Sequence, residues 1–356
     1  MLRKIGSILL GALLLAGCSS GREAEPGKTQ PEDKPAATQV QAEVLAENLR
    51  VPWSIAKSGE AFYISERPGA IVKIENGKVE LQKVVLKEKL SDASEAGLLG
   101  FVLDPDFPRT QSAFAYYTYN DAAGQKNRVV VLSHRDGVWK EELTLIDGLP
   151  SGPVHHGGRL EIGPDGKLYI TAGDAANPEL AQNPNTLGGK ILRMNLDGSI
   201  PDDNPFPGSS VYSYGHRNPQ GLAWLQDGTM VASEHGQSAH DEINVIKPGK
   251  NYGWPVIIGD EKRQGMETPV FHSGDVTWAP SGVAVYGDKL VVATLRGNAV
   301  REFDLTRKTT RELVNGLGRI RDVLIDGDDL YFVSNNTDGR GNPDETDDKL
   351  YRIRLK

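Results

Sequence analysis

One pattern recurs six times along this chain and constrains the fold more than any other feature. Each copy holds a short apolar strand, a turn with Gly or Asp, a second apolar strand, and a polar or glycine-rich corner. Successive copies start roughly 40 to 60 residues apart, a period that indicates propeller blades. The copies begin at Trp53, Ala96, Gly158, Gln220, Ser281 and Ile320.

Further apolar segments lie between the copies, so each copy has room for about four strands. No long segment shows the 3.6-residue period of a helix, and helical solenoids and α/β folds are therefore poor fits. The pattern predicts an all-β fold, a six-bladed β-propeller over residues 42–356. The segment that begins at Gln41 is expected to pair with the C-terminal strand KLYRIRL and to close the ring.

Such a propeller gathers sequence-distant residues around one mouth of its central channel. In each blade the innermost strand starts on one face of the disc, and the second strand returns to that face. Residues just before first strands and just after second strands therefore meet there. Many are polar: Glu95, His155, His156, Arg217, Asn218, Arg319 and Arg321 precede first strands, and Glu66, Arg67, Asp174, Glu234, His235, Arg296, Asn335 and Asn336 follow second strands.

His155 and Asp174 are the candidate catalytic pair at this mouth. His155 lies in a glycine-flanked loop, and Asp174 follows an apolar strand and a glycine. An Asp in that position is also a common turn cap, so the assignment depends on the expected proximity of the two residues. A carboxylate beside an imidazole can orient it as a general base.

Four arginines occupy matching blade positions around the same mouth. Because crowded guanidinium groups repel one another, they need carboxylate partners or an anionic ligand. A small, multiply anionic cofactor would satisfy them. The four are Arg217, Arg296, Arg319 and Arg321.

The N-terminus carries a targeting signal. An apolar run from Ile5 to Ala16 follows two basic residues and is too short to span a bilayer. The sequence Leu-Ala-Gly-Cys looks like a lipobox, so residues 1–17 are expected to be a lipoprotein signal peptide and Cys18, the only cysteine, to be lipidated. Residues 18–41 have the composition of a flexible tether. We therefore expect an extracytoplasmic protein anchored to a bacterial membrane through lipid, and the net charge of −8 makes nucleic acid an unlikely partner.

Several motifs together resemble one known family. They are EAGLLGFVLDPDF, HHGGRLEIGPDGKLYITAGD, GKILRMNLDGSIPDDNPF, YGHRNPQGLAW, SEHG with DEINVIKPGKNYGWP, APSG and RIRDV. In these segments the chain resembles the glucose/sorbosone dehydrogenase family of PQQ-dependent soluble aldose sugar dehydrogenases. The resemblance implies a six-bladed propeller that holds pyrroloquinoline quinone (PQQ) and calcium on one face. It further implies oxidation of the C1 hydroxyl of aldose sugars to lactones, with electrons passed to an external acceptor, a quinone or a redox protein.

The resemblance also implies roles for individual residues. His155 resembles the base that takes the proton of the sugar C1 hydroxyl, Asp174 its orienting partner, and Arg217 the residue that polarises the quinone oxygen. Glu95 stands where a cofactor-contacting Gln is common. Further cofactor ligands implied are Asn218, Arg296, Arg319 and Arg321. Implied calcium ligands are the carbonyl oxygens of Gly236 and Gln237, with Glu242 and Tyr252 matching a further site in some members.

Two other classes of function remain open. A metal-dependent propeller hydrolase such as a lactonase would need a central acidic metal cage, and this mouth is richer in Arg than in carboxylate. A non-catalytic sugar- or protein-binding propeller would leave the pairing of His155 with Asp174 unexplained. The chain has no dinucleotide-binding fingerprint, P-loop, nucleophile elbow or HExxH zinc motif.

Overall fold

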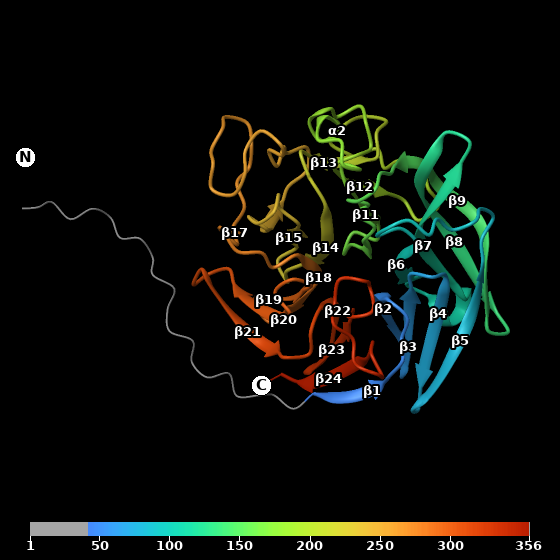
Figure 1. Ribbon diagram of the computed structural model, residues 1–356. Coiled ribbons are helices and arrows are strands. Elements are labelled where there is room, and N and C mark those ends of the chain that lie inside the picture. The colour runs from blue at the N-terminus through green and yellow to red at the C-terminus, as the bar shows by residue number, and fades with distance from the viewer. Residues whose placement is uncertain (1–41, 356) are drawn as a thin grey trace, which may run out of the picture. The chain divides into compact units, whose positions relative to one another are not determined.

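The computed structural model describes residues 42–355, which fold into six blades of four antiparallel strands around a central axis (Figure 1). Blades 1 and 2 form one eight-stranded sheet, because β5 and β9 pair in parallel at their outer edges, with Lys83 opposite Val138. The other blades are separate four-stranded sheets. The six-bladed β-propeller predicted from the repeats is therefore confirmed.

Tight glycine turns connect the strands within blades 1 and 2. Between β4 and β5, Asn76 and Gly77 both have positive φ (51° and 73°), which matches the two-residue hairpin turn that Asn-Gly favours. Blade 1 consists of β2 (Pro52–Ser58), β3 (Ala61–Glu66), β4 (Ala70–Glu75) and β5 (Lys78–Val85). Blade 2 consists of β6 (Leu98–Leu103), the short helix α1 (Phe107–Thr110), β7 (Ser112–Asp121), β8 (Gly124–Arg135) and β9 (Val138–Pro150).

Blades 3 to 5 repeat this arrangement, with longer connections in blades 3 and 4. Blade 3 consists of β10 (Leu160–Ile162), β11 (Leu168–Ala172), the short helix α2 (Glu179–Gln182), β12 (Lys190–Met194) and β13 (Val211–Tyr214). Blade 4 consists of β14 (Pro219–Trp224), β15 (Met230–Glu234), β16 (Glu242–Ile246) and β17 (Phe271–His272). Blade 5 consists of β18 (Pro280–Tyr286), β19 (Lys289–Thr294), β20 (Ala299–Asp304) and β21 (Thr309–Asn315).

Blade 6 closes the ring with strands from both ends of the described chain. It consists of β22 (Ile320–Asp326), β23 (Asp329–Ser334) and β24 (Leu350–Arg354), and its outermost strand is β1 (Glu43–Ala46). Glu43 lies opposite Arg352 in an antiparallel register, and Arg352 Nε donates to Glu43 Oε2 at 2.9 Å. The predicted pairing of the early segment with the last strand is confirmed, and it leaves β24 without a free edge.

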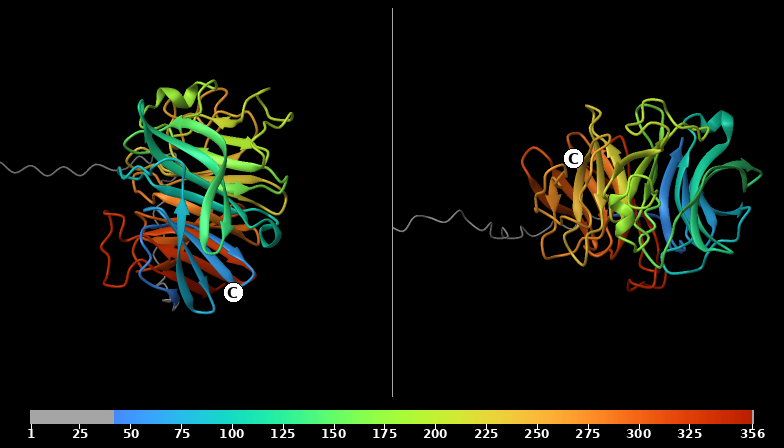
Figure 2. Two further views of the ribbon diagram at one scale, coloured as in Figure 1. Left: turned by 90° about the vertical axis from the view of Figure 1, so that its right-hand side faces the viewer. Right: turned by 90° about the horizontal axis from the view of Figure 1, so that it is seen from above.

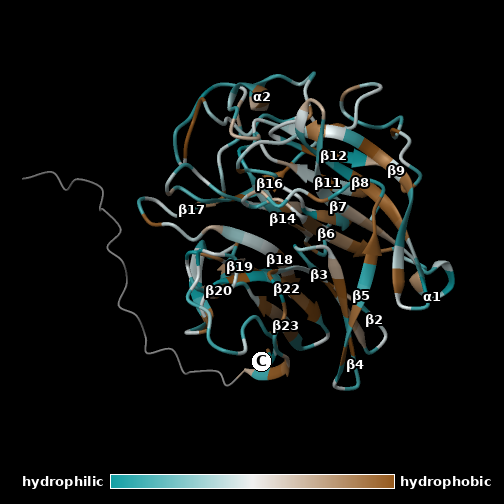
Figure 3. Ribbon diagram, turned by 45° about the vertical axis from the view of Figure 1, so that its right-hand side comes forward, coloured by the Kyte–Doolittle hydropathy of each residue, from teal (hydrophilic) through white to brown (hydrophobic). Residues whose placement is uncertain are grey.

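The core lies between neighbouring blades, where apolar side chains from facing sheets interdigitate. Leu99 and Tyr116 of blade 2 pack with Leu160 and Ile170 of blade 3, and each is at most 1% exposed. Burying one such side chain contributes about 1.5–3 kcal/mol. Figure 3 shows the result: hydrophobic residues concentrate on the strands, whereas the loops are mainly hydrophilic. The blades are therefore a rigid support for the loops at either end.

The loops at the starts of the innermost strands share one face of the propeller. The longest connection in blade 6, residues 335–349 between β23 and β24, projects from this face and is red in both views of Figure 2. In blade 2 the Tyr116 hydroxyl donates to the carbonyl oxygen of His156 at 2.8 Å, so the core directly holds the loop in front of β10.

The predicted signal segment, Cys18 and the tether lie outside the described residues. Within residues 42–355, no helix is long and apolar enough to cross a membrane.

Candidate active site

His155 and Asp174 are joined by a hydrogen bond, as the sequence predicted. His155 Nδ1 lies 2.7 Å from Asp174 Oδ1, and the side chain of Asp174 is fully buried. Glycine makes this approach possible, because a Cβ on Gly173 would lie 1.9 Å from the carbonyl oxygen of His155. His155 Nε2 has no hydrogen-bond partner among residues 42–355, and the side chain is 16% exposed. The imidazole can therefore accept a proton at its outer nitrogen while Asp174 holds the inner one.

The second oxygen of Asp174 is held by Trp254. The indole Nε1 donates to Asp174 Oδ2 at 2.8 Å, and Ala176 donates its backbone N–H to Oδ1 at 2.9 Å. Trp254, which the sequence motifs did not single out, is thus in direct contact with the candidate catalytic pair. The carboxylate is thus fully hydrogen-bonded, which is what a buried charge requires.

Glu95 bridges the loop of the candidate base to blade 6. Its Oε2 accepts the backbone N–H of His155 at 3.1 Å, and its Oε1 accepts Arg340 Nη1 at 2.6 Å. Burial alone would raise the pKa of Glu95, but Arg340 and the His155 N–H lower it to about 2. Glu95 and His155 both have left-handed backbones (φ 63° and 65°), a conformation that costs about 1–3 kcal/mol in a non-glycine residue unless its surroundings hold it. Both oxygens of Glu95 are in use, so the structure shows it bracing the His155 loop.

Arg217 lies beside His155 and Asp174, and not all of its guanidinium N–H groups have a partner within residues 42–355. Its guanidinium is 5.4 Å from the centre of the Trp254 ring, and Nη1 donates to the carbonyl oxygen of His235 at 3.2 Å. Its backbone is fixed on both sides, since its N–H donates to Glu234 and its carbonyl accepts the N–H of Asp174 at 2.8 Å. Burial lowers the pKa of Arg217, and Nε is buried with no hydrogen-bond partner within residues 42–355. A buried donor in this state is suited to an anionic or polar ligand.

The other predicted arginines differ in how their charge is balanced. Arg319 forms an ion pair with Asp338, Nη2 to Oδ2 at 2.7 Å, and both side chains are buried. Arg321 contacts only neutral groups: Nη1 donates to Gln220 Oε1 at 2.8 Å and Nη2 to Asn335 Oδ1 at 3.2 Å. Burial lowers the pKa of Arg321 to about 9.

Two adjoining pockets lie beside these residues; Glu95, Arg319 and Arg321 belong to their linings, whereas His155, Asp174 and Arg217 do not. The deeper pocket lies at the axis, and the wider one, of ≈ 390 Å³, lies between blades 5 and 6. Leu295 and Arg340 line both pockets. Arg296 is exposed at the rim of the wider pocket. The deeper pocket is lined by Trp53, Arg67, Glu95, His156, Gln220, His235, Arg321, Asp338 and Arg340, and the wider one by Arg296, Asn298, Arg319, Asn336 and Asn342, among others.

Two charged residues at this mouth were missed by the sequence reasoning, Arg340 and Asp338, and a third, Arg67, was placed there without a role. Arg340 and Asp338 come from the loop between β23 and β24, and Arg67 follows β3. The Arg67 guanidinium makes no hydrogen bond to any residue in 42–355, and burial lowers its pKa. Arg67 was placed at this mouth by its position after a second strand, yet nothing in its local sequence distinguished it from a surface charge.

Two further polar residues have structural roles. Asn218 Oδ1 accepts the N–H of Gly157 at 2.9 Å and so supports the His155 loop. His156 is buried, lies 3.1 Å from Ser151 Oγ through Nδ1, and has a pKa lowered by burial to about 4. It is therefore a neutral, buried histidine in the wall of the deeper pocket, whereas the side chain of His155 is 16% exposed.

The residues expected to hold calcium lie in blade 4, after β15 and around β16. A Cβ on Gly236 would lie 2.2 Å from the carbonyl oxygen of Ala239, so only glycine allows this tight turn, in which Gln237 O accepts the Ala239 N–H at 2.7 Å. Burial and the neighbouring Glu234 raise the pKa of Glu242 to about 8. The Tyr252 side chain is engaged elsewhere, since its hydroxyl donates to Val245 O at 2.7 Å. No cluster of three or more His, Cys, Asp or Glu side chains suited to a metal occurs in the part of the chain that the structure describes.

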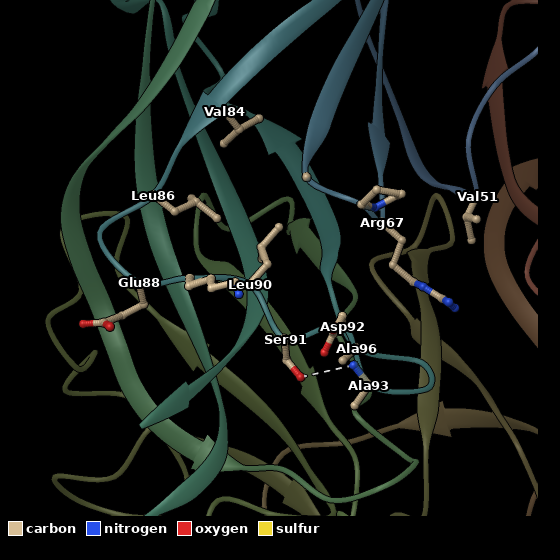
Figure 4. A pocket seen from close by; sticks show the side chains of 13 residues that line it. Val51, Arg67, Val84, Leu86, Glu88, Leu90, Ser91, Asp92, Ala93 and Ala96 are labelled. Atoms are coloured by element: carbon tan, nitrogen blue, oxygen red, sulfur yellow. Dashed lines mark hydrogen bonds between the residues drawn. The ribbon is translucent and has the colours of Figure 1, made fainter. Parts of the chain in front are cut away.

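A separate pocket of ≈ 570 Å³ lies between blades 1 and 2 near this face (Figure 4). Leu86, Leu90 and Val84 form its apolar side, and Ser91 Oγ accepts the N–H of Ala93 at 3.3 Å and Gln125 Nε2 at 2.7 Å. Arg67 lines both this pocket and the deeper axial pocket.

The fold and this site define a β-propeller with a carboxylate-bonded imidazole beside arginine-rich pockets. The chain belongs to the Glucose / Sorbosone dehydrogenase family, which it matches over residues 49–352. The family predicted from the sequence motifs is therefore confirmed.

Individual relatives agree with this assignment. The chain is 36% identical over 257 residues to Quinoprotein glucose dehydrogenase B of Acinetobacter calcoaceticus, a match that covers 62% of this chain and only 54% of that protein. It is 30% identical over 347 residues to an Aldose sugar dehydrogenase of Escherichia coli, covering 84% and 91% of the two chains. Among solved structures, the PQQ-bound form of Aldose Sugar Dehydrogenase from Streptomyces coelicolor is 36% identical and superposes with a TM-score of 0.84 over 90% of this chain and 99% of that one.

Proposed function

We propose that this protein oxidises the C1 hydroxyl of aldose sugars to lactones with PQQ as cofactor and passes the electrons to an external acceptor. The observation that carries the proposal is the His155–Asp174 pair beside pockets lined by arginines. When bound, PQQ would supply the hydride acceptor, which no side chain of this protein can provide.

The fit of an anionic cofactor follows from the charges at this mouth. Arg319 and Arg340 have carboxylate partners, in Asp338 and Glu95, whereas Arg321 has none among residues 42–355. In addition, Arg217 Nε and His235 Nε2 are buried with no hydrogen-bond partner within residues 42–355. The carboxylates and carbonyls of PQQ would satisfy these donors, so the residues present fit the group.

His155 is the general base of the proposed reaction. Asp174 accepts the Nδ1–H of the imidazole, so Nε2 is the nitrogen that takes the proton of the sugar hydroxyl. The buried carboxylate then stabilises the positive charge that forms on the ring. Arg217, packed against Trp254, would stabilise the negative charge that develops on the cofactor side of the site.

Calcium is part of the proposal and is supported by the chemistry of Glu242. A carboxyl whose pKa is raised by burial gains a favourable partner if a cation binds beside it. The carbonyl oxygens of Gly236 and Gln237 are hard donors in the turn that follows the Arg217 contact at His235. These main-chain donors would link a calcium ion to the cofactor pocket.

The two other functions considered from the sequence gain less support. A lactonase-type hydrolase would need a carboxylate-rich metal cage, and the axial pocket instead holds arginines that are partly unpaired. A solved structure titled a putative gluconolactonase is 12% identical to this chain, with a TM-score of 0.52, which shows a likeness of fold alone. A purely binding propeller would have no use for an imidazole oriented by a buried carboxylate.

The lipid anchor and the extracytoplasmic location also belong to this proposal. They are supported by the Leu-Ala-Gly-Cys motif, and a quinone or a redox protein near the membrane would then serve as acceptor. Replacement of the lipidated residue, Cys18→Ala, should release the protein from the membrane fraction. Membrane association that persists in this variant and still requires detergent for release would refute the anchor.

The function is tested by reconstitution. Apo-protein is incubated with PQQ and Ca²⁺, and reduction of a redox dye is followed with a panel of aldoses and with lactones as a hydrolase control. We expect dye reduction that requires both PQQ and an aldose. Hydrolysis of lactones without PQQ would favour the hydrolase, and binding of a sugar without turnover would favour a binding module.

A further inference from the structure

Trp254 completes the hydrogen bonding behind the candidate base. Its indole Nε1 is the donor to Asp174 Oδ2, at 2.8 Å, while Oδ1 faces His155 at 2.7 Å. We propose that Trp254, held in place by Gln182, is a positioning residue that sets the orientation of Asp174 and thereby the tautomer of His155. The inference rests on the function proposed above.

The backbone of Trp254 is fixed at both of its polar atoms. Its N–H donates to Gly215 O at 2.9 Å, and its carbonyl oxygen accepts Gln182 Nε2 at 2.6 Å. Gln182 is further joined to Asn251 by two hydrogen bonds: Asn251 Nδ2 donates to Gln182 Oε1 at 2.8 Å, and Gln182 Nε2 donates to Asn251 Oδ1 at 3.1 Å. Gln182 thus contacts both ends of the 251–254 turn.

Close packing makes this turn intolerant of displacement. Asn251 Oδ1 also accepts the N–H of Gly253 at 2.9 Å. A Cβ on Gly215 would lie 2.1 Å from the same oxygen, so the end of blade 3 touches the turn directly. The backbone that carries Trp254 is therefore held between α2 and the end of blade 3.

Gln182 itself stands on an anchored helix, α2. Lys190, fully buried on β12, donates through Nζ to the carbonyl oxygens of Leu180 at 2.7 Å, Ala181 at 3.1 Å and Gly188 at 2.6 Å. These bonds satisfy carbonyls that a short helix leaves free. α2 lies in the connection between β11 and β12 that also contains Asp174, and Figure 1 shows α2 beside this part of blade 3. Trp254 thus bonds to Asp174 and to Gln182, which both lie in this one connection.

The contacts among Asp174, Trp254 and Gln182 have a chemical role in addition to their structural one. An indole N–H can only donate, so it requires an acceptor at Asp174 Oδ2 and opposes rotation of the carboxylate. With Oδ2 occupied, Oδ1 stays directed at His155 Nδ1, which must then carry the proton, and Nε2 is left as the acceptor. Supporting partners of this kind typically change activity by about 10- to 100-fold when removed.

The test compares three variants of the full chain. Trp254→Phe keeps an aromatic ring against Arg217 but removes the donor, and Gln182→Leu removes the amide that holds the turn. Gln111→Leu is the matched control, because Gln111 likewise donates its side-chain amide to a backbone carbonyl, Phe107 O, outside the site. Reduction of enzyme-bound PQQ at saturating aldose is measured by stopped flow, together with KM, the PQQ dissociation constant and the melting temperature. The ¹⁵N spectrum of the His155 ring is recorded in apo-protein.

We expect Trp254→Phe and Gln182→Leu each to slow PQQ reduction about 10-fold at saturating sugar, with KM and the PQQ dissociation constant within about twofold of wild type. The double variant should be no slower than Trp254→Phe, because both changes remove one interaction. The control should behave as wild type. The ¹⁵N spectrum should show one tautomer, protonated at Nδ1, in wild type and a mixture in both variants.

Unchanged reduction rates, multiplicative losses in the double variant, or an unchanged His155 spectrum would each overturn the inference. A loss confined to KM, PQQ affinity or melting temperature would reduce Trp254 and Gln182 to a structural role and overturn it as well. If no aldose reduces PQQ in wild type, the proposed function fails, and the ¹⁵N spectra still decide whether Trp254 sets the tautomer.

Discussion

Replacing Asp174 by Asn should slow sugar oxidation without emptying the site. The carboxylate receives three donors: His155 Nδ1 at 2.7 Å and the Ala176 N–H at 2.9 Å on Oδ1, and Trp254 Nε1 at 2.8 Å on Oδ2. An amide has one oxygen and one NH₂ group, so it cannot accept from both sides. Either Trp254 or the pair of His155 and Ala176 is left facing a donor.

The size of the effect follows from these contacts. With the amide oxygen toward His155, the tautomer is kept, but the imidazolium loses its charged partner and the Trp254 donor is unsatisfied. With the amide reversed, His155 must move its proton to Nε2 and can no longer act as base. A hydrogen bond to a charged group contributes about 1.5–3 kcal/mol, which corresponds to a loss of roughly 10- to 150-fold in rate.

The assay is single-turnover reduction of bound PQQ by an aldose, measured by stopped flow in the Asp174→Asn holoenzyme. Asn is nearly isosteric with Asp, and no predicted cofactor arginine bonds to the Asp174 side chain, so PQQ affinity should change little. A wild-type reduction rate would refute the reasoning, since it would mean that the orientation of His155 does not depend on this carboxylate.

Three further predictions concern the ligands of the pocket. The pKa of Glu95 is about 2, so between about pH 4.5 and pH 2 the unfolded chain binds more protons than the folded one. The free energy of unfolding should therefore decrease as the pH is lowered through this window. In urea titrations, Glu95→Gln should reduce this decrease by at most about 3 kcal/mol. Arg321→Ala should weaken PQQ binding about 10-fold or more, while the apo-protein melts no earlier than wild type, because a buried charge without a carboxylate partner is removed; a lower melting temperature with unchanged PQQ affinity would contradict this. Chelation of calcium should lower PQQ affinity and added calcium should restore it, whereas affinity that survives exhaustive chelation would exclude the site at Gly236 and Gln237.

The sequence was sufficient for the fold because the repeat is encoded locally. Each strand-turn-strand copy carries its own apolar alternation and glycine turn, and blade closure follows from the apolar segments at the two ends. Residues just before first strands and just after second strands were expected to meet at one mouth, and this expectation placed His155, Asp174 and Arg217 together. Their actual contact depends on Gly173, where any side chain would strike the His155 carbonyl.

What the sequence could not give depends on loop conformation. The contact between Trp254 and Asp174 was not predicted, because nothing local shows that the 251–254 turn folds back toward Asp174 across blades 3 and 4. Arg340 and Asp338 lie a few residues beyond the end of β23, outside the positions that were expected to meet at the mouth. A wider window after β23 would have found both, although their pairing with Glu95 and Arg319 is a tertiary contact.

The most direct test of the account is the rate at which an aldose reduces PQQ in reconstituted His155→Ala. A positioned general base contributes about 10²- to 10⁴-fold, so this variant should be at least about 100-fold slower than wild type. PQQ should still bind, because the arginines that would hold it are untouched. A wild-type reduction rate in His155→Ala with PQQ bound would contradict the assignment of His155 as the base.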